Sequence, residues 1–334
     1  MKKVKFMVVA VLAMVLVFGV GSAMARDAIL FPYFATGGGN VTFFQIINTA
    51  AISTPITGTS QGNLDYVYYY NYADENEVCV HYDRTGRTTR NDIFLFEASG
   101  VYAGQLLPGD TTSTAPPLQV RPAWGTLAVK HSADNFGLDL EGKLFGQAYV
   151  ANVNTGTIFA YNAINDPDEY DSDFYFASNA DDRHTVSFLP ETYASTTWFF
   201  FPVYDVDLFE DILWNSTLEF SSEETNGVYD NNETRSSGFK YLPVGCWDTT
   251  ITRDGKPLNP GEGPVTANFF YTLKQVLNAS QYNAVKGTGG FTDIYWGKYG
   301  GYAYKFQSST ALGKPMNIMI YEPQLDGGYS SYTK

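Results

Sequence analysis

Residues 64–70 read Leu64-Asp65-Tyr66-Val67-Tyr68-Tyr69-Tyr70. Side chains of an extended chain alternate between two faces, so this stretch places aromatic or aliphatic groups on both faces. Aromatic and β-branched residues favour strands over helices. A strand that is apolar on both faces is typical of the centre of a sheet covered on both sides. The stretch therefore predicts a β-fold built in layers.

Similar runs recur along the chain, separated by turns such as Gly37-Gly38-Gly39-Asn40. Aromatic residues make up 16% of the chain and charged residues 17%, a composition that favours strands and turns. The sequence predicts a mainly β fold of one or more antiparallel β-sandwiches. One short helix is expected near residues 267–280, where Leu273, Val276 and Leu277 share a face. The predicted strands cover residues 28–34, 41–47, 64–72, 78–82, 93–97, 125–131, 147–153, 157–161, 186–189, 197–204, 211–220, 239–242, 247–253, 291–296, 302–307 and 317–322.

Residues 1–25 have the three parts of a secretory signal peptide. Lys2, Lys3 and Lys5 form the basic part, residues 6–20 the apolar part, and Ala23-Met24-Ala25 the cleavage site. We therefore predict an exported protein that loses this leader. The alternative is an uncleaved anchor, which the short apolar run and the small residues at the cleavage site disfavour.

The chain without its leader is long enough for two domains. An acidic, turn-rich segment interrupts the strand pattern, and we place a linker there, at residues 166–184. It would separate a β-sandwich domain at 26–165 from a second β-rich domain at 185–334. A possible duplication is indicated by Phe31-Pro32-Tyr33-Phe34, which is echoed by Phe201-Pro202-Val203-Tyr204. Chance similarity between aromatic strands is the alternative.

The charge balance excludes several classes of partner. The formal net charge is −14, and removing the three leader lysines leaves 18 basic against 35 acidic residues. Such an acidic protein should repel nucleic acid and anionic lipid. After the leader, no apolar run reaches the length of a membrane-spanning helix. We therefore expect no nucleic-acid partner and no transmembrane span.

The two cysteines, Cys79 and Cys246, permit one disulfide bond in an exported protein. Two separately buried thiols are the alternative, because the sequence does not report the distance that disulfide geometry requires.

Calcium is the cofactor that the acidic residues suggest. Asp166, Asp168, Asp171 and Asp173 lie within eight residues of one another, and calcium binds six to eight oxygen ligands supplied by such loops. The glycine and the last glutamate of an EF-hand loop are missing, so a solvated acidic linker is the alternative. Further acidic groups lie at residues 205–211 and 230–233.

No nucleophile elbow, phosphate-binding loop, haem-attachment motif or local zinc motif is present. A zinc site built from His81, His131 and His184 is conceivable, but their wide spacing favours structural or surface roles. Pairs of carboxylates could serve a glycosidase, although so acidic a chain will bring some pair together by accident. Aromatic rings could stack on sugars, or they could be buried in the core. The tryptophans are Trp124, Trp198, Trp214, Trp247 and Trp296.

The opening Ile29-Leu30-Phe31-Pro32-Tyr33-Phe34, followed by a glycine turn and Ile46-Ile47-Asn48-Thr49, resembles exported bacterial β-sandwich proteins of uncharacterised function. The segment from Gly146 to Val150 is similar too. The resemblance covers roughly residues 28–160. It implies a secreted or surface-displayed sandwich and brings no catalytic residues with it.

These observations favour a non-enzymatic structural, adhesive or binding protein of the cell surface or periplasm. Its partner would be a cell-surface or extracellular protein, a polysaccharide, or a second copy of the chain. A carbohydrate-binding or carbohydrate-active protein is one alternative. An outer-membrane β-barrel is another, although its strands should be longer than those predicted here.

Overall fold

The computed structural model describes residues 28–49, 61–72, 80–89, 92–101, 114–118, 122–131, 144–165, 174–175, 183–202, 205–206, 215–220, 227–245, 268–296, 301–309, 311 and 316–321. Most of these residues lie in antiparallel strands, which confirms the predicted β-sandwich class. The predicted leader, residues 1–25, falls outside these ranges.

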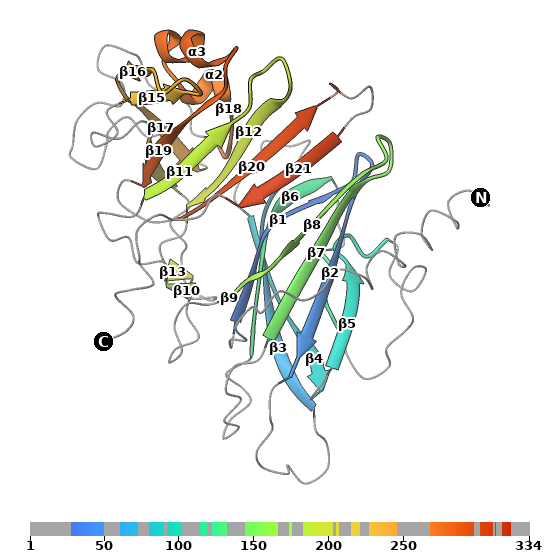
Figure 1. Cartoon of the computed structure of the whole chain (residues 1–334). Helices are drawn as coiled ribbons and strands as arrows, with labels where there is room; N and C mark the ends of the chain where they lie inside the picture. The colour runs from blue at the N-terminus through green and yellow to red at the C-terminus, as the bar shows by residue number, and fades with distance from the viewer. Residues whose placement is uncertain are drawn as a thin grey trace.

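The first sandwich pairs two antiparallel sheets (Figure 1). One sheet has the order β4-β3-β6-β1-β9, and the facing sheet has the order β5-β2-β7-β8. The strands of the first sheet are β4 (Val80–Thr89), β3 (Gln61–Tyr72), β6 (Ala123–His131), β1 (Ala28–Thr36) and β9 (Ile164–Asn165). Those of the second are β5 (Asp92–Glu97), β2 (Asn40–Asn48), β7 (Leu144–Asn152) and β8 (Thr157–Asn162).

Strand β3 has the buried position that its sequence predicts. It lies between β4 and β6. Its even-numbered residues from Leu64 to Tyr70 enter the core between the two sheets. Val67 and Tyr69 face the other way and are buried as well, at 1% and 4% exposure. The sheet is therefore covered on both sides at this strand.

A bulge in β1 turns one aromatic ring away from the core. The pairing of β1 with β6 shifts register between Phe31 and Phe34, both of which are core residues. Pro32 lies inside the shift, and because proline has no N–H it is accommodated in strands at such irregularities. The side chain of Tyr33 consequently lies among aromatic rings outside the first core.

The second sandwich also pairs two antiparallel sheets, and it encloses a second hydrophobic core. One sheet has the order β18-β12-β20-β21. In the other, β19 pairs with β11 along one side, and with β14 and β15 along the other. The strands of the first sheet are β18 (Phe270–Thr272), β12 (Ser195–Pro202), β20 (Gly301–Ser309) and β21 (Met316–Tyr321). Those of the second are β11 (Arg183–Phe188), β19 (Gly290–Trp296), β14 (Asn215–Phe220), β15 (Gly227–Asp230), β16 (Arg235–Ser237) and β17 (Lys240–Gly245).

Strands β14 and β15 act as two halves of one strand. Phe220, the last residue of β14, is opposite Ile294 of β19, and Tyr229 of β15 is opposite Phe291 of the same strand. β11 pairs along the whole of the other side of β19. β14 and β15 therefore both lie on the side of β19 that is opposite β11. β17 and β16 continue the sheet in the same way, since β17 pairs with β14 and β16 with β15.

The single helix expected near residues 267–280 is replaced by a strand and two helices. β18 occupies the start of that range, and α2 (Leu273–Val276) and α3 (Ala279–Val285) follow. The break at Leu277 has extended backbone geometry. Asn278 then starts α3 with a reciprocal capping box: its Oδ1 accepts a bond from Gln281 N, while Gln281 Oε1 accepts one from Asn278 N. Leu273, Val276 and Leu277 are buried in the second core, as their shared face predicts.

The acidic segment that we predicted as a linker, residues 166–184, lies mostly outside the described ranges. Within it, β10 (Phe174–Tyr175) pairs with β13 (Asp205–Val206), and β11 begins before the segment ends. The two hydrophobic cores draw their residues from opposite sides of this segment, at 29–163 and 186–303.

An aromatic contact joins the two sandwiches. The sheet of β12, β20 and β21 lies between the first sandwich and the sheet of β19 (Figure 1). The Tyr33 ring meets Phe199, Phe306 and Phe270 of that sheet edge-on, with centroids 5.5, 5.2 and 6.2 Å apart. Trp124 of β6 meets Phe270 at 5.0 Å. Burial in this contact raises the pKa of Tyr33 to about 12.

Candidate functional site

Several residues predicted to form sites lie outside the described part of the chain. They are the calcium candidates Asp166, Asp168, Asp171 and Asp173, and the disulfide candidates Cys79 and Cys246. Both predictions therefore stay predictions. Among the residues that are described, no group of three or more His, Cys, Asp or Glu side chains could hold a metal ion.

The three histidines do not meet in one site. His81 pairs with Tyr69 of β3, whereas His131 pairs with Leu64 of the same strand. These two positions on β3 are five residues apart, which is about 17 Å, and their side chains face opposite sides of the sheet. His184 belongs to β11 in the second sandwich. A shared zinc site is therefore not formed.

His131 is a structural residue whose ring nitrogens are buried away from solvent. It ends β6 and faces the first core, beside Leu64. Both ring nitrogens are buried, and neither has a hydrogen-bond partner in the described structure. This desolvation lowers the pKa of His131 from 6.5 to about 4.

The stability of the protein should reflect this lowered pKa. As the pH falls below 6.5, His131 becomes protonated in the unfolded chain. In the folded chain it becomes protonated only when the pH falls to about 4. The stabilisation of the folded state associated with neutral His131 is therefore complete above pH 6.5 and is lost between pH 6.5 and 4, by up to about 3 kcal/mol.

Urea titrations of wild type and His131→Gln over this pH range test that expectation. The difference in unfolding free energy between the two proteins should vary with pH in this window and level off outside it. His81→Gln is the matched control, because the His81 side chain is 64% exposed. A pH-independent difference for His131→Gln would contradict the assignment.

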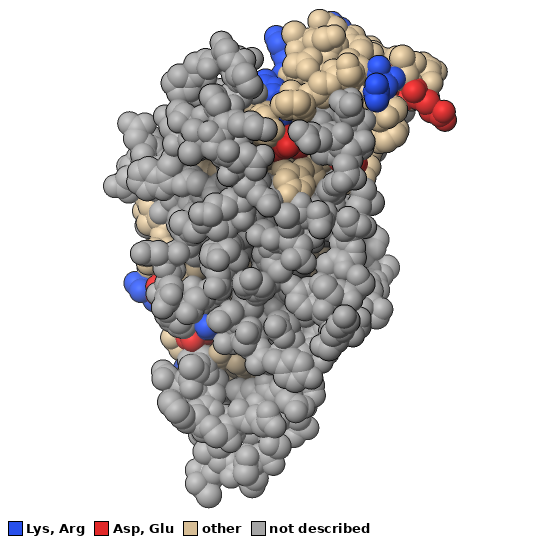
Figure 2. Space-filling model, turned by 90° about the vertical axis from the view of Figure 1, so that its left-hand side faces the viewer, with Lys and Arg blue, Asp and Glu red and all other residues tan. Residues whose placement is uncertain are grey.

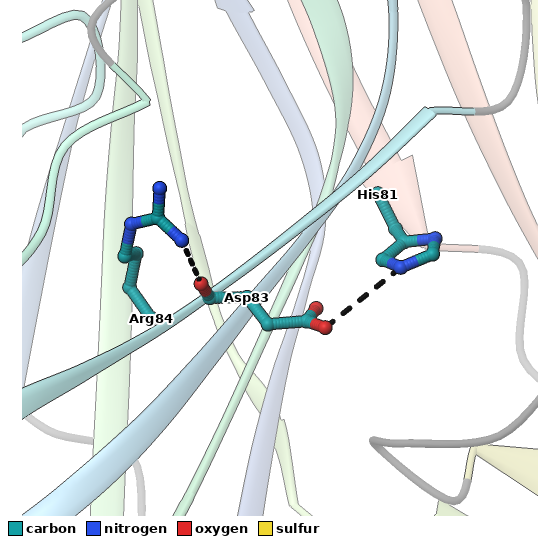
Figure 3. Close-up of polar contacts among 3 residues, drawn as sticks. All are labelled: His81, Asp83 and Arg84. Atoms are coloured by element: carbon teal, nitrogen blue, oxygen red, sulfur yellow. Dashed lines mark hydrogen bonds and ion pairs between the residues drawn. The ribbon is translucent and has the colours of Figure 1, made fainter.

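Strand β4 forms an edge of its sheet, and several of its residues make polar contacts. Figure 3 shows His81, Asp83 and Arg84 on this strand. The Arg84 guanidinium donates to the Asp83 carbonyl at 2.7 Å, and His81 Nε2 lies 3.8 Å from Asp83 Oδ2. Arg87 N donates to Thr114 Oγ1, and Arg87 O accepts from Thr114 N.

These contacts occupy backbone and side-chain groups along β4 that another strand would otherwise use. Charged side chains and covered backbone groups are the usual protection of an edge strand against pairing with other molecules. The exposed contact between His81 and Asp83 itself contributes little to stability. We therefore interpret the charged cluster on β4 as protection of an edge rather than as a reactive site.

The two tryptophans whose side chains are described, Trp124 and Trp198, pack against other aromatic rings inside the protein. Trp198 is completely buried in the second core. Trp124 lies in the contact between the sandwiches, 5.5 Å from Phe269. Trp214, Trp247 and the side chain of Trp296 lie outside the described residues.

Tyrosine and phenylalanine side chains lie on the outer face of the β19 sheet. In β19, Thr292 and Ile294 point inward and are completely buried, so Phe291, Asp293 and Tyr295 point outward. The same alternation holds on the neighbouring strands, where Val228, Leu218 and Leu242 are core residues. We call this surface the aromatic face, and it comprises Tyr229, Phe239, Tyr241, Phe291 and Tyr295 with Glu219 and Asp293.

Two rows of paired residues cross the aromatic face. In the first, Glu219 of β14 lies directly between Tyr241 of β17 and Tyr295 of β19. In the second, Tyr229 of β15 lies opposite Phe291 of β19, and their rings stack at 5.3 Å with an interplanar angle of 10°.

The aromatic face is partly open to solvent. Phe291 and Phe239 are 40% and 43% exposed, and the rings of Phe239 and Tyr241 are 5.3 Å apart. Tyr229, Tyr241 and Tyr295 are half-buried. Asp293 is buried and accepts a hydrogen bond from Thr185 Oγ1 at 3.0 Å. The described acidic and basic side chains visible in Figure 2 occur singly and not as a patch of one sign.

The position of the aromatic face follows from residues that the strand pattern had already indicated. Residues 239–242 and 291–296 were predicted as strands, and in each an outward tyrosine lies next to a core residue, Tyr241 beside Leu242 and Tyr295 beside Ile294. What the sequence does not give is the register that puts Glu219 between two tyrosines.

Comparisons of the chain with protein-family models, with curated proteins and with solved structures find no match. Within the described ranges, no helix combines the length and the apolar character needed to cross a membrane.

Proposed function

We propose that this chain is an exported, non-enzymatic binding protein that acts at the cell surface or in the periplasm, in an adhesive or structural role. The observation that carries the proposal is the aromatic face. Tyrosine is among the residues that dominate binding energy at interfaces, and a surface that collects exposed rings on a regular sheet is typical of a binding site. The leader predicted at residues 1–25 supports export.

The arrangement of the two sandwiches supports the same role. The outer face of the β12-β20-β21 sheet contacts the first sandwich through rings such as Phe199 and Phe306. The aromatic face belongs to the other sheet of the second sandwich and points away from that contact. The first sandwich and the aromatic contact thus provide a base, and the aromatic face is directed outward.

A double replacement on the aromatic face should abolish most binding. We expect the labelled wild-type protein to bind envelopes prepared from the producing cells, and Tyr241→Ala/Tyr295→Ala to bind at least about tenfold more weakly, because two ring anchors are removed. Both side chains point outward, so circular dichroism should show an unchanged fold.

Tyr193→Ala is the matched control. Tyr193 is 62% exposed and lies in the turn between β11 and β12, outside the aromatic face. It should bind as the wild type does. Equal binding by the wild type and the double variant would refute a binding role for this face.

A further inference from the structure

We infer that the aromatic face binds a neutral polysaccharide, an inference that rests on the proposed binding function and specifies its ligand. It is carried by one juxtaposition, in which the carboxylate-bearing Glu219 lies between Tyr241 and Tyr295 in one row across three strands. The stacked pair Tyr229 and Phe291 lies further along the same face.

The geometry suits an extended ligand that is laid across strands. The two rows meet β19 at Tyr295 and Phe291, four residues apart, which is about 13 Å along the strand. Directly paired residues in a row have Cβ atoms about 5 Å apart. Aromatic rings at two positions on one sheet face can contact the apolar faces of separate sugar units of an extended ligand, whereas a compact ligand would reach only one of these positions.

The charges on the aromatic face favour an uncharged ligand. Glu219 and Asp293 are the acidic residues, but Asp293 is buried and bonded to Thr185. The exposed Arg235 is opposite Tyr229 in the second row. The half-buried Glu219 and Arg235 thus bring one charge of each sign to the described part of this face, while the whole chain carries a net charge of −14. An anionic polymer would be repelled by the chain, and a strongly cationic one finds no surplus of carboxylates on the face.

A protein partner suits this face less well than a glycan does. The buried centre of a protein interface is depleted of charged residues, yet Glu219 lies at the middle of a row here. One carboxylate oxygen of Glu219 is already buried within the protein, and covering the rest of the carboxylate with apolar side chains would be unfavourable. Sugar hydroxyls, in contrast, donate hydrogen bonds to a carboxylate and accept them from a guanidinium, directly or through water.

The test is affinity electrophoresis of the full exported chain in gels containing xylan, mixed-linkage β-glucan, galactomannan or starch, with alginate as the anionic control. At least one neutral polymer should retard the wild type, and alginate should not. Tyr295→Ala should weaken the retardation about tenfold, because one stacked ring contributes on that order. Tyr193→Ala should be retarded like the wild type.

Periodate treatment of cell envelopes separates this inference from the proposed function, because periodate cleaves the vicinal diols of sugars. Loss of wild-type binding after periodate, together with retardation by a neutral polymer, supports a glycan ligand. Binding that survives periodate but still requires Tyr241 and Tyr295 overturns the glycan and leaves the binding function standing. Retardation by alginate alone, or by none of the polymers, also overturns the glycan.

Discussion

Replacing Trp198 with alanine is expected to lower the free energy of unfolding of the second sandwich by about 3–5 kcal/mol, the usual cost of deleting a large buried aromatic side chain. Trp198 has no exposed surface and is among the largest buried side chains of the protein. Its ring meets Phe188 of β11 at 6.2 Å and Phe220 of β14 at 6.0 Å, so it links both sheets of this sandwich. Alanine would leave a cavity between them.

Trp198→Phe provides the matched comparison. The indole N–H of Trp198 is buried and meets no hydrogen-bond acceptor among the described residues. Phenylalanine therefore removes an unpaired donor and keeps most of the apolar contact, so its cost should be less than half that of alanine. Urea unfolding followed by circular dichroism measures both variants. Equal losses for the two would show that the cavity is not the cause.

The second large effect is expected at Gly125. This residue of β6 is paired on one side with Phe34 of β1 and on the other with Tyr70 of β3. A Cβ atom added at Gly125 would lie 1.9 Å from the carbonyl oxygen of Tyr69 and 2.7 Å from the Cα of Tyr70. Both are backbone atoms of the adjacent strand, so they cannot rotate away as a side chain would.

Gly125→Ala should therefore force β3 and β6 apart and cost about 4 kcal/mol or more, which is exceptional for the addition of one methyl group. Gly287→Ala is the matched control, since a Cβ atom there meets nothing within 4 Å. Urea unfolding and limited proteolysis should show a weakened first sandwich for Gly125→Ala and wild-type behaviour for Gly287→Ala. A Gly125→Ala protein as stable as the wild type would refute the close approach of the strands.

The sequence predicts the sheets well where alternation is strong. Tyr66 and Tyr69 show this, because their neighbours on β3 make both faces apolar and both faces are buried. It predicts the helical region less well, since the apolar spacing of Leu273 and Leu277 does not reveal that Asn278 caps a second helix. The start of the second helix is marked by the capping pair Asn278 and Gln281, and not by the spacing of apolar residues.

The candidate site was harder to predict for a physical reason. Pro32 indicates an irregular strand, but the ring contacts of Tyr33 depend on how the second sandwich docks. In the same way, Glu219 joins two tyrosines only because three strands, distant in the chain, adopt one register. Pairing between distant strands is set by the whole fold and not by local sequence.

The split strand made of β14 and β15 has a practical consequence. Phe220 of β14 and Tyr229 of β15 are held beside the same strand β19 by two separate sets of strand pairs. Parts of one sheet can open locally while the rest of the domain stays folded. Amide hydrogen exchange is therefore expected to report two separate opening events along this side of β19, one for β14 and one for β15.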